Sequence, residues 1–190
     1  MIRLLNKEFT MELITKLEKI VLGWTKNVPH LPPTARKWLG INIWWIVLIS
    51  AIITAIAFLS SLDTLFRYIS LLGTTSSAYY INTSYTSYAV MNIAVNLVFL
   101  AASAALLGLA VKPLKEKQKK GWVLLFFALL VIALSVVVGA VLSFSVGGFI
   151  VQILFGAIVL GIAAYFITEI HGEFAHTAKV TGEKVTTKKA

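Results

Sequence analysis

The residues whose spacing could support metal chemistry are two glutamates and a histidine near the C-terminus. Glu169, Glu173 and His176 stand at positions i, i+4 and i+7, which share one side of a helix. Such ligands suit zinc, manganese or iron if a second element completes the shell. No span or other loop offers that completion, and His30 is the only histidine outside this C-terminal segment. We therefore expect a solvated helix end, with the metal site as the alternative.

Other catalytic patterns are missing from the sequence. There is no cysteine, which excludes thiolate catalysis and disulfides. The chain contains no Walker loop, no HExxH motif and no recognisable Ser–His pair. An ion-coupled carrier normally keeps an acid or base within the bilayer, and the apolar stretches described next hold none. We expect no enzyme, no catalytic residues and no cofactor.

Four long stretches lack any Asp, Glu, Lys, Arg or His side chain, and each is long enough to cross a bilayer. A hydrocarbon core of about 30 Å needs roughly 20 apolar residues in a helix. The stretches are 41–62, 89–111, 121–144 and 148–168. They predict an all-α membrane protein whose domain, residues 33–170, is an antiparallel bundle of four transmembrane helices.

The positive charges lie almost entirely on one side of these four spans. Of 17 lysines and arginines, only Arg67 falls on the other side. The positive-inside rule then predicts a multi-pass protein of the cell (inner) membrane with both termini cytoplasmic. The formal charge of +9 follows this topology, so we expect no nucleic-acid partner.

The short loop between the second and third spans carries five of these cations. At roughly 1 kcal/mol per near-surface charge, they should contact phosphates of anionic lipid on the cytoplasmic side. The residues are Lys112, Lys115, Lys117, Lys119 and Lys120.

Three further segments flank or link the spans. Residues 1–28 carry an apolar stripe at helical spacing and predict an amphipathic cytoplasmic or interfacial helix. That helix could lie among headgroups, pack on its own bundle or pair with a second copy. Asp63 is a candidate N-cap for a short outer interfacial helix through Leu72. Residues 171–190 read as a polar cytoplasmic tail.

Three amide side chains lie inside the predicted spans. Asn92 and Asn96 are one turn apart on one face, and Gln152 lies at a similar depth in the outer third of the bilayer. They could form interhelical hydrogen bonds of about 0.6–2 kcal/mol each. The alternative is a small polar pocket open to the outside.

The start of the third span resembles a known group of proteins. Lys119–Lys120–Gly121–Trp122, followed by Leu124, Leu125 and Phe126, is similar to a stretch of small, uncharacterised four-helix integral membrane proteins of candidate-phylum bacteria with reduced genomes. The resemblance covers 112–170. It implies a bacterial inner membrane, and it adds no catalytic residue. The N-terminal amphipathic segment and the long outer segment do not match that group.

Taken together, these features favour a non-enzymatic membrane protein that acts through lateral protein or lipid interaction, as a scaffold or accessory subunit. Its partners would be the bilayer itself and a second copy or another membrane protein. The alternative is a small-solute transporter or channel, or a lipid-binding protein, with the outward-facing pocket at Asn92, Asn96 and Gln152.

Overall fold

The computed structural model describes residues 29–74, 83–143 and 145–175, together with Lys16, Ile20 and Gly23. Apart from those three residues, the predicted amphipathic helix over 1–28 lies outside this part of the chain. The predicted tail from His176 onward lies outside it as well.

The described residues fold into four long helices and one short one, and they contain no strand. The elements are α2 (Pro33–Thr74), α3 (Thr83–Lys115), α4 (Lys119–Leu142), α5 (Val146–Glu169) and α6 (His171–Ala175). The first four are long and apolar enough to cross a membrane. The prediction of an all-helical protein with four candidate spans is confirmed, and it indicates a multi-pass membrane protein.

Helix α2 is much longer than a bilayer requires. Its 42 residues extend about 63 Å, whereas the 24 residues of α4 extend about 36 Å. The predicted separate helix starting at Asp63 is wrong, because α2 continues through that residue without a break. No glycine or proline occurs from 41 to 72 to interrupt it. The Asp63 carboxylate instead accepts a hydrogen bond of 2.8 Å from Arg67 Nε, one turn further on.

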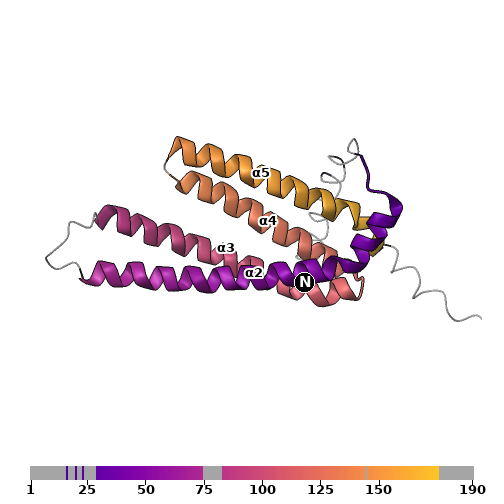
Figure 1. Ribbon diagram of the computed structural model, residues 1–190, viewed down its shortest axis with the longest axis horizontal. Coiled ribbons are helices and arrows are strands. Elements are labelled where there is room, and N and C mark those ends of the chain that lie inside the picture. The colour runs from indigo at the N-terminus through magenta and orange to yellow at the C-terminus, as the bar shows by residue number, and fades with distance from the viewer. Residues whose placement is uncertain are drawn as a thin grey trace, which may run out of the picture.

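The long helices pack in a row rather than a closed ring. Helix α2 lies along α3, α3 along α4 and α4 along α5, while α6 contacts α2, α4 and α5. Figure 1 shows the pair α2–α3 and the pair α4–α5 meeting at one end and diverging towards the other. We call the meeting end the basic end, because Arg36, Lys115 and Lys119 lie there, and the opposite end the far end.

The best-buried large side chains gather at the basic end. Trp122 stacks on Phe126 with ring centroids 5.5 Å apart, and it lies nearly perpendicular to the ring of His171, with centroids 4.7 Å apart. Leu114, Ile170 and Phe174 are also almost fully buried. Burial of Phe174 explains why the chain from 171 to 175 folds back as α6, where a polar tail was predicted.

A tight turn joins α3 to α4 within this core. Lys117 adopts a positive φ of 54°, and Gln118 N donates to Pro113 O at 2.8 Å. The turn brings Gly121 onto the preceding helix end, where an added Cβ would lie 2.6 Å from Leu114 N. Only glycine permits this approach without moving the backbone.

We predict that Gly121→Ala destabilises the protein although alanine is the better helix former. Overpacking of this kind costs about 1–3 kcal/mol, which exceeds the gain in helix propensity of about 1 kcal/mol. Gly108→Ala is the control, because nothing lies within 4 Å of the added Cβ in α3. Thermal unfolding in mild detergent should show a lower midpoint for Gly121→Ala alone. Equal midpoints for both variants would contradict the close packing.

Candidate functional site

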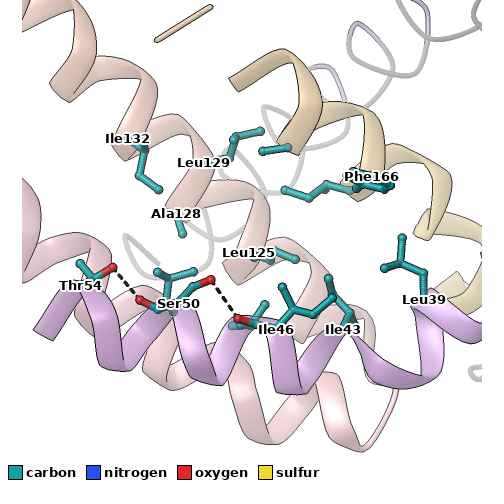
Figure 2. A pocket seen from close by; sticks show the side chains of 14 residues that line it. Leu39, Ile43, Ile46, Ser50, Thr54, Leu125, Ala128, Leu129, Ile132 and Phe166 are labelled. Atoms are coloured by element: carbon teal, nitrogen blue, oxygen red, sulfur yellow. Dashed lines mark hydrogen bonds between the residues drawn. The ribbon is translucent and has the colours of Figure 1, made fainter. Parts of the chain in front are cut away.

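A groove opens on the side of the helix row, between α2 and α5. Its volume is about 410 Å³. Figure 2 shows side chains of α2, α4 and α5 converging on it. Ala128 of α4 and Val47 of α2 are buried in its lining, whereas Ile46 and Phe166 are 44% and 39% exposed. Buried side chains therefore close the groove on one side, and its other side is open to the surroundings. The 14 lining residues are Leu39, Ile43, Ile46, Val47, Ser50, Thr54, Leu107, Leu125, Ala128, Leu129, Ile132, Ala163, Phe166 and Ile167.

The lining of this groove is chemically apolar. Its two hydroxyl groups donate to carbonyls of their own helix, Ser50 Oγ to Ile46 O at 2.9 Å and Thr54 Oγ1 to Ser50 O at 2.7 Å (Figure 2). No lining residue is ionisable. The groove thus suits an apolar occupant and offers no group for acid–base chemistry.

At the basic end, a buried carboxylate joins the C-terminus of α5 to the start of α2. The Glu169 side chain is only 2% exposed. Its Oε1 lies 2.6 Å from His30 Nδ1, and its Oε2 accepts a hydrogen bond of 3.2 Å from Leu31 N. Arg36 Nε lies 3.1 Å from the same Oε2 and forms an ion pair with it. A carboxylate removed from water requires partners of this kind.

Two hydrogen bonds from aromatic side chains reinforce this connection between α5 and the start of α2. The Tyr165 hydroxyl donates to Pro29 O at 2.7 Å, which holds the chain before α2 against α5. Trp122 Nε1 donates to Ile167 O at 2.8 Å, which ties α4 to the same turn of α5. We call the set of contacts made by Glu169 with His30, Leu31 and Arg36 the Glu169 junction.

The predicted metal ligands do not act together in the described part of the chain. Glu169 belongs to the junction, and the Glu173 side chain packs on Gly40 of α2. His176 lies outside the described residues, so the three-ligand set stays a prediction. Among the residues that the structure describes, no three His, Cys, Asp or Glu side chains are close enough to hold a metal ion.

Sequence reasoning missed the junction because its members are far apart along the chain. His30 and Glu169 are separated by 139 positions. The available signal was the position of Glu169 directly after an apolar span, where a carboxylate entering the bundle needs a cation. Arg36 and Lys37 lie at a similar depth, and nothing in the sequence indicates which of the two cations pairs with Glu169.

The three predicted amides do come together, in a second cavity towards the far end. Asn92, Asn96 and Gln152 line one pocket of about 210 Å³ between α3, α4 and α5. Asn92 Nδ2 makes long contacts of 3.5 Å with Leu142 O and 3.4 Å with the Tyr88 hydroxyl. Asn96 and Gln152 make no side-chain hydrogen bond to any described residue. Whether this pocket binds a molecule stays a prediction.

The five lysines of the predicted lipid-contacting loop all lie at the basic end. The Lys115 ammonium sits 5.0 Å from the centroid of the Trp44 ring in α2. Lys112 and Lys120 border a surface cavity of about 520 Å³ together with Glu116. Lys112, Lys115, Lys119 and Lys120 are exposed, and Lys117 is half-buried. Their contact with lipid phosphates stays a prediction.

No protein-family model, curated protein or solved structure matches this chain.

We predict that Glu169→Gln lowers stability by about 1–3 kcal/mol, because it removes the charge that faces Arg36. The exposed pair Asp63–Arg67, with side chains 63% and 76% exposed, supplies the control. Asp63→Asn should cost only about 0.3–0.5 kcal/mol. The free energy of unfolding of each variant, measured in mixed micelles, gives both changes. Equal losses would show that the junction is no stronger than a surface ion pair.

Proposed function

We propose that this protein is a non-enzymatic membrane subunit that acts through lateral contacts within the bilayer, as a scaffold or accessory component. The open groove between α2 and α5 carries the proposal. Protein interiors and their contacts are close-packed, and an empty groove of about 410 Å³ would leave its walls without partner atoms. In a bilayer, a lipid chain or a partner's side chains would fill that space.

The chemistry available at the described sites agrees with a binding role. The groove has no ionisable lining, and at its end the Glu169 carboxylate contacts both His30 and Arg36. Catalysis requires a titratable group directed at a bound molecule. The arrangement of these residues favours binding of a partner over catalysis.

The distribution of charge supports an orientation with the basic end in the cytoplasm. Lys37, Lys115 and Lys119 lie at this end, as the positive-inside rule requires for a cytoplasmic face. Measured from Lys37, a 30 Å hydrocarbon core ends after about 20 residues of α2. With the basic end in the cytoplasm, Asp63, which is 26 residues after Lys37, would lie outside the hydrocarbon, and the end of α2 would project beyond the outer surface of the membrane.

The absence of cysteine makes a crosslinking test clean, because any introduced thiol is unique. We predict that Ile46→Cys, labelled with a benzophenone maleimide in native membranes, gives one dominant photoadduct of defined mass. Ile53→Cys is the control, since Ile53 is 61% exposed and does not line the groove. It should give a broad mixture of bulk-lipid adducts. Mass spectrometry of the purified adducts distinguishes the two, and matching mixtures would contradict a specific lateral partner.

The amide pocket supports a second candidate, a transporter or binding protein for a small polar molecule. Unpartnered amides in hydrocarbon are unfavourable, since each lacks the hydrogen bonds that water would supply. Asn96 and Gln152 face this situation within the described residues. A polar molecule in the pocket would provide the missing bonds.

We predict that replacing Asn92, Asn96 and Gln152 together with leucine removes a bound polar molecule seen by native mass spectrometry of the wild-type protein. The melting temperature should stay constant or rise, because the three amides make few strong bonds to their neighbours. Unchanged bound masses would reject the second candidate. A large loss of stability with no change in bound mass would assign the amides to interhelical hydrogen bonding.

A further inference from the structure

We propose that the occupant of the groove is one acyl chain of an anionic phospholipid, from the leaflet at the basic end, with its phosphate at Arg36. This inference rests on the lateral-contact function proposed above and names the partner. It follows from the size of the groove, its lining and the charge at its end.

The groove holds much less volume than a transmembrane helix occupies. Its α2 wall runs from Leu39 to Thr54, which is about 22 Å of helix. A helix of 10 Å diameter would displace about 1,700 Å³ over that length, roughly four times the volume of the groove. A single acyl chain crosses one leaflet, about 15 Å of hydrocarbon, and is far thinner. The groove is therefore long enough for one acyl chain lying along α2 from the basic end, and the chain would end before the far end of the groove.

The lining also lacks what a polar or helical partner would use. Helices associate in lipid through close backbone packing and interhelical hydrogen bonds, because the bilayer supplies no hydrophobic drive between them. The hydroxyl groups of Ser50 and Thr54 already donate within α2, and the open side is bordered by the bulky Ile46 and Phe166. An acyl chain requires only apolar contact, which these walls provide.

A cation with spare hydrogen-bond donors stands at the basic end of the groove. Arg36 precedes Leu39 by three residues and Ile43 by seven, so all three share one face of α2. Its Nη2 donates to Leu31 O at 3.3 Å, while its buried Nε is paired with Glu169 but makes no aligned hydrogen bond. Most of its five N–H donors therefore have no partner among the described residues.

This guanidinium can accept a phosphate without losing its carboxylate partner. The Arg36 side chain is 36% exposed, whereas the Glu169 side chain is 2% exposed and lies behind it. The carboxylate also accepts a hydrogen bond from Leu31 N, so its charge is not stabilised by Arg36 alone. Arginine binds phosphate through two parallel hydrogen bonds, so a headgroup on the exposed side adds bonds that the protein leaves open.

The test compares two phospholipids with identical acyl chains, phosphatidylglycerol and phosphatidylcholine, titrated onto the full-length protein and read by native mass spectrometry. We expect one tightly retained lipid per chain, with phosphatidylglycerol bound more tightly. Arg36→Gln should weaken phosphatidylglycerol binding by about tenfold through loss of a charge-assisted hydrogen bond. Lys37→Gln removes an adjacent exposed cation and should change the affinity by less than about threefold.

A second pair of variants tests the position of the acyl chain. Ala163→Phe adds bulk to the groove wall on α5, six residues before Glu169, and should weaken both lipids by about tenfold or more. Ala55→Phe adds the same bulk to an exposed position of α2 outside the groove and should leave both affinities unchanged. Because these variants leave the Glu169 junction intact, they decide the question even if Arg36→Gln fails to fold.

The outcomes separate this inference from the function on which it rests. Equal retention of the two lipids by the wild-type protein overturns the preference for an anionic headgroup, and undiminished retention by Ala163→Phe overturns the placement of the acyl chain in the groove. A polypeptide captured at Ile46→Cys overturns the lipid assignment as well while supporting the lateral-contact function. Bulk-lipid adducts at Ile46→Cys together with no retained phospholipid would overturn both.

Discussion

A carboxylate held out of water at the end of an apolar helix is the constraint on which this architecture depends. With its side chain 2% exposed, Glu169 needs hydrogen-bond donors and a positive charge within reach. The sequence segment from His30 to Arg36 supplies them, although it lies at the other end of the described chain. The first and last long helices are thereby joined at one end only.

The single junction explains why the bundle stays open. Helix α4 packs against both α3 and α5, and its Trp122 fills the space at the basic end while donating to Ile167 O. Beyond that point, no comparable contact among the described residues draws α5 towards α2, and the two helix pairs diverge (Figure 1). Small side chains such as Ala128 and Ser50 at the divergence leave the groove unfilled.

The general architecture was readable from the sequence, because a bilayer imposes a minimum length of apolar helix. The first and last residues of the helices could not be predicted in the same way. Charges mark where hydrocarbon ends, but helical hydrogen bonding continues until a residue interrupts it, so α2 begins at Pro33 and passes through Asp63. Asn96 and Gln152 could be placed in one pocket because depth along a helix follows from residue count alone.

The Glu169 junction and the groove could not be predicted from the sequence and became visible only in the structure. Pairing of His30 with Glu169 depends on how the chain before α2 crosses the end of α5, and no local pattern encodes that crossing. Likewise, apolar composition is the same for a helix face that packs on a neighbour and for one that borders an open space. Val47 and Ile53 are equally apolar, yet one is 3% exposed in the groove wall and the other is 61% exposed.

The junction and the groove also affect one another energetically. An occupant that contacts both α2 and α5 stabilises the arrangement in which they are joined, because a molecule that binds only the folded form adds its binding free energy to stability. Conversely, the Glu169 junction fixes the separation of the groove walls at the basic end and so reduces the ordering cost of binding. Arg36 belongs to both features, since its guanidinium pairs with the buried carboxylate on one side and is exposed on the other. Loss of the junction should therefore weaken binding in the groove even though no groove-lining residue is changed.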